Sequence, residues 1–292
     1  MLEVGSEIES AARGIAVRER VNGTLKRLSK TGALPTLPPV ASAALSLARD
    51  PDADIDRICK IIQTDLGLAA RVLRLANSAA IGRRTPARRL MDAVITVGLR
   101  KTCDVLVAAA VRHLYDMEQP EARALWDHSL ATAVASEELA RRTRLADPGR
   151  AFLPGLFHDV GRVAFLLADE LSYEVLERLA EADEGDRCSL ERDWYGFDHA
   201  SGGAVLVEEW GLALEQCDAV RFHHSPEDAG AARDLAVVVA AADFLSYSIG
   251  CGAGGVPPDE EVIARVGLSL AEETSLSHRI LELFQEQKEL LE

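Results

Sequence analysis

Aromatic side chains are scarce in this chain, at 5% of 292 residues, and β-branched residues rarely alternate with polar ones. Both shortages disfavour β-sheet, because strands draw on aromatic and β-branched side chains in alternation. Alanine and leucine dominate instead, and both favour helix. The sequence therefore predicts an all-α protein, long enough for one large domain or two small ones.

Paired cysteines and long apolar runs are also missing. No CxxC motif occurs, and the widely spaced cysteines are typical of buried or incidental thiols in a reducing cytosol. The longest candidate for a membrane span, residues 234–249, is interrupted by Asp243. Residues 1–19 carry several acids and no apolar block, unlike a signal peptide. We therefore expect a cytoplasmic protein without a membrane partner. The cysteines are Cys59, Cys103, Cys188, Cys217 and Cys251.

Basic residues are outnumbered: 32 Lys and Arg face 47 Asp and Glu, which gives a net charge of −15. A surface this acidic repels phosphate backbones, so general nucleic-acid binding is disfavoured. The exception is residues 83–101. A solvated surface is the ordinary interpretation of such a segment, and a dock for an acidic partner or a phosphorylated ligand is the alternative. Its basic residues are Arg83, Arg84, Arg88, Arg89, Arg100 and Lys101.

The order of apolar stripes, caps and prolines predicts four segments. Residues 1–30 hold an amphipathic helix at about 6–29, and a proline-stiffened connector follows. Residues 31–116 form an N-terminal helical half, with Asp54 and Asp65 each capping a helix. Residues 117–256 form a second half, opened by a long helix over 120–142. Residues 257–292 hold the terminal helices. Further helices are expected at 40–48, 54–62, 65–75, 90–97, 101–115, 151–167, 172–180, 198–209, 214–222 and 235–249.

Five of the seven histidines fall between residues 128 and 224. Taken singly, each has an ordinary explanation as a hydrogen-bonded core residue or a surface group, and Asp159 could simply cap a turn. Taken together, they lie on or beside apolar helices, where an unpaired imidazole or carboxylate costs several kcal/mol. The set is His128, His158, Asp159, His199, His223, His224 and Asp243.

Several imidazole nitrogens and carboxylate oxygens that face one another in a core are best satisfied by a shared divalent metal ion, and ligands of these types suit Fe, Mn, Zn or Ni. His158 and Asp159 would point about 100° apart if they shared one helix, so they could flank a site and ligate one or two ions. A carboxylate that bridges two metals suits attack on phosphorus. Arg162, four residues after His158, could then stabilise phosphate charge.

The chain resembles the HD-related output domain (HDOD) family of bacterial signalling proteins over residues 31–283. The resemblance is carried by LPTLPPV at 34–40, IIQTDLGLAARVLRLANSA at 61–79, AVITVGL, GLFHDVGR, YGFDHASGGAVLVEEWGL and AVRFHHSPEDA. It implies an HD-domain-like multi-helix bundle, distantly related to HD and HD-GYP phosphohydrolases. In those relatives metals are held at positions that match His128, the His158–Asp159 pair, His199, the His223–His224 pair and Asp243.

Three departures from the HD enzymes matter. Arg162 stands where a lysine is usual, Ala124 replaces a glutamate found in some relatives, and SPEDAGAARD at 225–234 replaces the glycine-tyrosine-proline loop. The resemblance therefore implies a signalling output or scaffold domain that binds partner proteins. A metal-dependent phosphohydrolase acting on a nucleotide or cyclic dinucleotide, with Asp159 and Arg162 as catalytic residues, is the alternative. A metal- or redox-sensing switch is the third interpretation. Oligomeric state stays open.

Overall fold

The computed structural model describes residues 19–24, 35–50, 52–78, 81, 85–115, 117–182, 186–252, 260–267 and 270–292. Every regular element within these ranges is a helix, so the all-α prediction is confirmed. Most of the amphipathic helix predicted at 6–29 lies outside the described residues. Residues 19–24 are helical, and Val21 is buried in a cluster with Phe165 and Tyr173.

The N-terminal half consists of α2 (Pro39–Arg49), α3 (Ile55–Ile62), α4 (Leu66–Ala76), α5 (Leu90–Val97) and α6 (Leu99–Val111), followed by one 3-10 turn, Arg112–Leu114. The predicted caps are confirmed. The Asp54 carboxylate accepts a hydrogen bond from the amide of Arg57, and Asp65 accepts from Gly67 and Leu68. These bonds satisfy amides that the first helical turn leaves without partners.

α4 buries one face and leaves its first residue in solvent. Leu66 is 87% exposed. Leu66 is the first residue of α4, directly after the Asp65 cap, and projects beyond the packed part of the helix. The core face is made by Leu68, Val72, Leu75 and Ala76.

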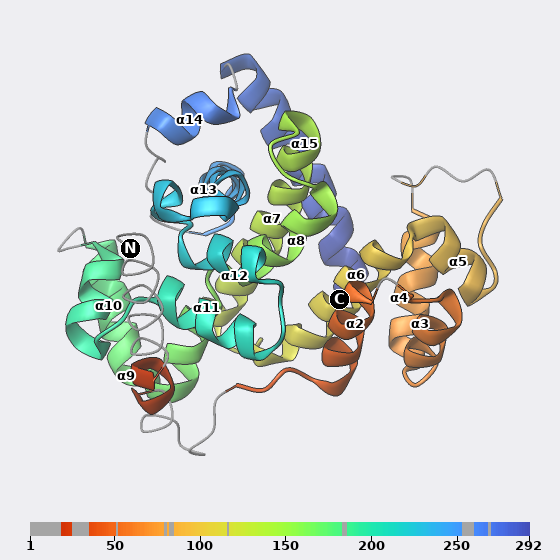
Figure 1. Ribbon diagram of the computed structural model, residues 1–292, viewed down its shortest axis with the longest axis horizontal. Coiled ribbons are helices and arrows are strands. Elements are labelled where there is room, and N and C mark those ends of the chain that lie inside the picture. Colours follow the sequence, from red (N-terminus) through yellow and green to blue (C-terminus); the bar gives the residue numbers. More distant parts are fainter. Residues whose placement is uncertain are drawn as a thin grey trace, which may run out of the picture.

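The second half comprises α7 (Pro120–Thr143), α8 (Pro148–Phe157), α9 (Val160–Glu181), α10 (Arg187–Tyr195), α11 (His199–Glu209), α12 (Leu214–Arg221) and α13 (Arg233–Ser248). In Figure 1, α7 and α8 run through the centre, with α9–α13 on one side and α2–α6 on the other. One apolar cluster joins buried residues of α2, α4 and α6 to those of α7 and α8. The core is therefore continuous across the predicted boundary at residues 116–117.

Of the terminal helices, α14 (Glu260–Val266) packs on α13, and α15 (Leu270–Leu291) returns toward the N-terminal half. Arg71 donates to the carbonyl of Leu291, and Arg74 donates to the carbonyls of Glu289 and Leu290. The last carbonyls of a helix have no partners within it, so these arginines cap α15. Lys288 also donates to Asp127 of α7 at 2.6 Å.

The predicted continuous helix over 151–167 is wrong at its most important point. α8 ends at Phe157, two residues of turn follow, and α9 starts at Val160. His158 and Asp159 therefore occupy a junction between helices. The ring Nδ1 of His158 lies 2.8 Å from the carbonyl of Gly155, an acceptor that a continuing helix would use for its own amides. The junction lets the two side chains converge on one site.

One segment, Pro148–Ala180, has the length and composition of a membrane-spanning helix, with an 18-residue window of mean hydropathy 1.3. It comprises α8 and α9, and 83% of that window is buried inside the structure. Asp159 and Arg162 interrupt its apolar run. Core helices of globular domains often have the same composition.

Candidate metal centre

The structure brings all seven predicted ligand residues together from five parts of the fold. His128 lies in the middle of α7, and His158 with Asp159 forms the α8–α9 junction. His199 is the first residue of α11, where Asp198 caps the helix through Ser201. His223 and His224 follow α12, and Asp243 lies in α13. The first and last members of the cluster, His128 and Asp243, are 115 positions apart along the chain but lie side by side in the structure.

Asp159 lies at the centre of the cluster and faces histidines with both oxygens. Its Oδ2 is 3.7 Å from Nε2 of His128 and 3.6 Å from Nε2 of His158. Its Oδ1 is 3.2 Å from Nε2 of His199. A carboxylate that contacts imidazoles on two sides is suited to bridge two adjacent positions.

The first half of the cluster is completed by Asp243. Its Oδ1 lies 3.0 Å from Nε2 of His128 and 3.6 Å from Nε2 of His158, and these two ring nitrogens are 3.1 Å apart. Donor atoms of His128, His158 and Asp159 all lie within 4.8 Å of one another. This half therefore offers two imidazoles and two carboxylates.

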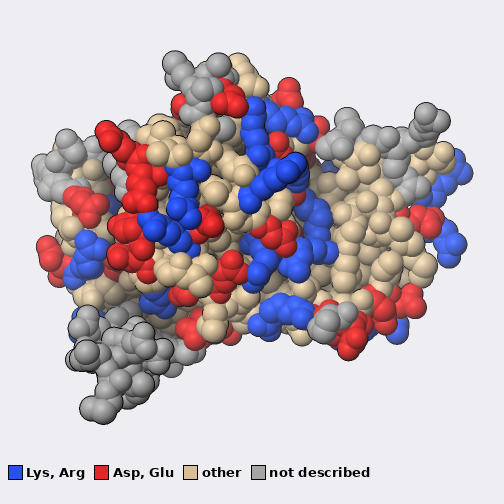
Figure 2. Space-filling view, turned by 45° about the horizontal axis from the view of Figure 1, so that its top comes forward, with Lys and Arg blue, Asp and Glu red and all other residues tan. Residues whose placement is uncertain are grey.

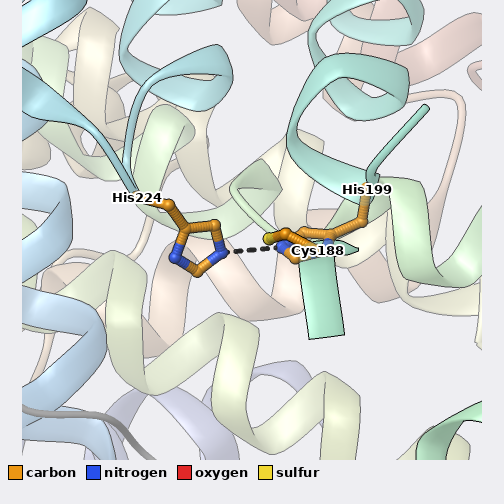
Figure 3. Close-up of side chains that lie close together, drawn as sticks. All are labelled: Cys188, His199 and His224. Atoms are coloured by element: carbon orange, nitrogen blue, oxygen red, sulfur yellow. Dashed lines mark hydrogen bonds between the residues drawn. The ribbon is translucent and has the colours of Figure 1, made fainter. Parts of the chain in front are cut away.

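The second half consists of His199, His223 and His224 around the other oxygen of Asp159. Nε2 of His199 lies 3.0 Å from Nε2 of His224, as the dashed line in Figure 3 marks. His224 is the exposed member, whereas His199 and His223 are buried. Cys188 of α10 lies within ligand distance of His199 and His224, a proximity that its isolated place in the sequence did not suggest.

The outer nitrogen of each buried histidine is held in place by the surrounding structure. Nδ1 of His128 contacts the carbonyl of Cys251 at 3.1 Å, and Nδ1 of His223 contacts that of Val220 at 2.7 Å. Nδ1 of His158 contacts the Gly155 carbonyl, as noted above. Because a carbonyl only accepts, each Nδ1 carries a proton, and in the neutral ring Nε2 keeps its lone pair toward the cluster. This arrangement is typical of metal-ligating histidines.

His199 is held by Glu191, a fully buried residue of α10 that sequence analysis missed. Oε2 of Glu191 accepts from both the amide and Nδ1 of His199, at 2.6 and 2.7 Å. Its Oε1 accepts from the hydroxyl of Tyr173 at 2.7 Å. The spacing of eight residues between Glu191 and His199 is the only sequence signal for this contact, and it is a weak one.

Close approach of α9 and α11 places His199 beside Asp159. Gly161 lies two residues after Asp159, and a Cβ at this position would be 2.1 Å from the carbonyl oxygen of His199. The same Cβ would lie 2.7 and 2.8 Å from C and Cα of His199. Only glycine permits the observed separation of the two backbones.

Charges within the cluster shift its titration. Burial alone would lower the pKa of His158, but the carboxylates of Asp159 and Asp243 outweigh it and raise this pKa to about 9. Burial would raise the pKa of Asp159, yet Arg162 and the neighbouring imidazoles hold it well below its ordinary value. Burial and neighbouring imidazoles lower the pKa of His223. A bound cation would therefore displace protons from the cluster.

Two buried atoms of the cluster lack a hydrogen-bond partner: Nε2 of His223 and Oδ1 of Asp243. Oδ1 of Asp243 nevertheless lies 3.0 Å from Nε2 of His128, so it already faces the imidazoles of the cluster. An unsatisfied buried polar atom costs about 1–3 kcal/mol. The donor set and these free lone pairs fit a divalent metal ion, and the clusters could hold one.

Arg162 is engaged within the protein. Its Nη1 donates to Oδ2 of Asp159 at 2.6 Å, and its Nη2 donates to Oε2 of Glu177 at 2.7 Å. The sequence predicted that Arg162 contacts a phosphate group. In the structure Arg162 already has two carboxylate partners, so it would have to contact the phosphate in addition to them or in place of one of them.

The predicted basic segment 83–101 does not form one surface. Lys101 forms an ion pair with Glu137 of α7, and the side chain of Arg100 lies against Gly149. Arg88 and Arg89 remain exposed before α5. Arg83 and Arg84 lie outside the described residues.

Comparison with known proteins supplies the family. Residues 34–226 match the HDOD domain. The chain belongs to the HDOD domain family. A Treponema pallidum (strain Nichols) protein without a characterised role is 28% identical over 197 residues, which cover 65% of this chain. The matched region is 38% of that relative's length.

Solved structures share the fold. An HDOD protein of unknown function from Geobacter sulfurreducens has a TM-score of 0.74 at 28% identity, covering 94% of this chain and 99% of its own. A Marinobacter aquaeolei VT8 protein, provisionally named for signal transduction, has a TM-score of 0.74 at 21% identity over 95% and 65%. A Shewanella amazonensis SB2B protein, provisionally named a phosphohydrolase, has a TM-score of 0.70 at 24% identity over 89% and 95%. These solved structures confirm the multi-helix bundle that the sequence predicted.

Proposed function

We propose that this HDOD protein is a signal-transduction output domain whose His/Asp cluster binds one or two divalent transition-metal ions. The observation that carries the proposal is the orientation of the buried imidazoles. Nδ1 of His128, His158 and His223 faces a carbonyl and that of His199 faces Glu191, so that four Nε2 atoms are directed at the Asp159 region. Burying four imidazole rings with their Nε2 atoms turned toward one another costs free energy unless a ligand binds the lone pairs.

The donor set limits the class of ion. Imidazole nitrogens with carboxylate oxygens suit Fe, Mn, Zn or Ni, whereas Ca²⁺ and Mg²⁺ prefer oxygen donors alone. His128, His158 and Asp243 would hold one ion, and His199, His223 and His224 a second, with Asp159 shared between them.

Metal content tests the proposal directly. We expect anaerobically purified protein to contain about one or two equivalents of transition metal per chain, measured by inductively coupled plasma mass spectrometry. Asp159→Asn should lose most of this metal, because it removes charge from both halves while retaining the side-chain shape. His113→Ala is the matched control, since His113 is exposed and lies outside the cluster.

Metal-free wild-type protein from every anaerobic preparation, even after supplementation with each metal, would contradict the proposal. Equal metal content in Asp159→Asn and wild type would also contradict it. Circular dichroism of the same samples separates loss of metal from loss of fold.

A metal-dependent phosphohydrolase is the second candidate, supported by a cavity of about 460 Å³ that opens onto His128 and is lined by Arg162, Arg178 and Arg187. A bound divalent ion would supply Lewis acidity toward a phosphoryl oxygen. The chain's own residues would orient the phosphate through Arg178 and exclude water with the apolar wall at Leu125 and Leu166. Turnover of bis-p-nitrophenyl phosphate or cyclic di-GMP, abolished in Asp159→Asn, would favour this candidate over a binding domain.

The signalling role requires a partner protein, and we place its contact on the N-terminal half. Figure 2 shows an uncharged area on the side of the molecule formed by α3–α5, with charged residues at its edge. Leu66 of α4 and Met91 and Ile95 of α5 are large apolar side chains exposed on these helices, and the exposed Arg88 and Arg89 directly precede α5. Apolar groups beside basic ones fit an acidic partner with an apolar centre.

A further inference from the structure

The cavity beside the cluster has the size of a small-molecule site. Its volume of about 460 Å³ exceeds what one or two metal ions need and falls within the range of about 300–1,000 Å³ typical of ligand pockets. His128 and Tyr247 border it on the side of the cluster. Ala124, one turn before His128, leaves this wall open where a longer side chain would project into the space.

Three arginines line this cavity, and two of them share one carboxylate. Arg162 donates to Oε2 of Glu177 at 2.7 Å, and Nε of Arg187 lies 3.1 Å from Oε1. The two oxygens of Glu177 thus face two guanidinium groups, which is how a phosphate group would meet them. Glu177 belongs to α9, and Arg187 is the first residue of α10.

The arginines retain unused donors. The buried Nε–H of Arg162 makes no hydrogen bond to the described part of the chain, and the Nε–H of Arg187 meets Oε1 of Glu177 at 3.1 Å without hydrogen-bond geometry. Arg178 also lines the cavity and forms no ion pair with the described residues. Buried donors without acceptors are costly, so the cavity wall is prepared for an additional anionic group.

We propose that this cavity binds a small organic phosphate through Arg162, Arg178 and Arg187, and that Glu177 acts as a built-in competitor for the phosphate position. The inference concerns the same site and rests on the proposed metal-binding function. Ligand entry would transfer the guanidinium contacts of Arg162 and Arg187 from the Glu177 carboxylate to the phosphate oxygens. A bound phosphate would therefore loosen the contact between α9 and α10 that Glu177 now maintains.

The test is isothermal titration of the metal-loaded protein with AMP, inorganic phosphate and adenosine. Glu177→Gln removes the competing charge and keeps the side-chain shape, so AMP should bind about tenfold more tightly than to wild type, as expected for loss of one nearby like charge. Inorganic phosphate should gain in the same direction. Adenosine, which lacks the phosphate, should be unaffected.

Glu174→Gln is the matched control, because Glu174 lies on the same helix, lines the same cavity and forms no ion pair with the described residues. It lowers the acidic charge by the same amount and should tighten AMP binding by no more than about twofold, because Glu174 is partly exposed to screening solvent and holds none of the three arginines. If AMP affinity rises equally in Glu177→Gln and Glu174→Gln, the rise reflects only the lower total negative charge, and the role of Glu177 as a competitor is overturned. That role is also overturned if AMP binds Glu177→Gln more weakly than wild type, because Glu177 would then position the arginines for the ligand.

Arg178→Gln provides an independent measurement if Glu177→Gln fails to fold. We expect it to weaken AMP binding at least threefold, since it removes a cation from the cavity. Unchanged binding in Arg178→Gln, or binding of adenosine as tight as that of AMP, would overturn the phosphate assignment. Metal content measured on the same samples keeps this outcome distinct from failure of the metal site.

Discussion

The contact between Gly161 and the backbone of His199 yields a prediction of definite size. In Gly161→Ala the new methyl carbon would start 2.1 Å from the His199 carbonyl oxygen, whereas an ordinary contact of this kind needs about 3.4 Å. All three nearest atoms belong to the backbone, so no side chain can rotate away. α9 and α11 must move apart by about 1 Å, which separates Asp159 from His199.

Overpacking of a well-packed core costs about 1–3 kcal/mol, and a clash with backbone atoms lies at the upper end. We therefore expect Gly161→Ala to lose about 3 kcal/mol of stability, which lowers the Tm by roughly 6–12 °C in a domain of this size. Differential scanning calorimetry measures this loss, and mass spectrometry of the same samples should show less bound metal. Gly23→Ala is the control, because its added Cβ meets nothing within 4 Å. A Gly161→Ala protein with wild-type Tm and metal content would refute the reasoning.

Two further predictions concern the surroundings of the ligands. Glu191→Ala should lower metal affinity about 10–100-fold, as measured by competition with a chromophoric chelator, because His199 loses the acceptor that orients its ring; an unchanged affinity would show that Glu191 is dispensable. The raised pKa of His158 means that its stabilising contribution to the metal-free protein is complete below about pH 6.5 and is lost as the pH rises through about 9. In thermal melts with excess chelator, the Tm should therefore decrease as the pH is raised from about 6.5 to about 9, whereas the Tm of the metal-loaded protein should not decrease over this range. The same pH dependence of Tm in both samples would contradict the assignment to His158.

Sequence patterns predicted those elements that carry local signals. Asp54 and Asp65 marked the starts of α3 and α4, and Pro120 marked the start of α7, because capping and proline geometry depend on neighbouring residues only. α10 was missed. Its sequence RCSLERDWY has no apolar stripe, and it buries Cys188, Glu191 and Tyr195, which depend on partners elsewhere in the chain.

The candidate site was predicted as a set of residues but not as a geometry. The order of the histidines, Asp159 and Asp243 along the chain was enough to predict which residues belong to the cluster. The structure shows that these residues lie together. The junction at His158–Asp159 could not be predicted, because the apolar residues on both sides continue the helical pattern. The engagement of Arg162 by Glu177 also depends on the fold, since 15 residues separate them.

The junction at His158–Asp159 lies between segments that reach different apolar clusters. α8 and the start of α9, through Val160 and Val163, belong to the large cluster with α7, whereas Phe165 and Ala168 further along α9 belong to another cluster with Tyr195 and Phe197. A ligand held by residues of this junction has an affinity that depends on the angle between the two helices. By thermodynamic reciprocity, any partner that changes the angle changes the affinity by the same factor that the ligand applies to the partner. If the cluster binds a ligand, the break in the helix would couple its occupancy to the orientation of α9 relative to α8.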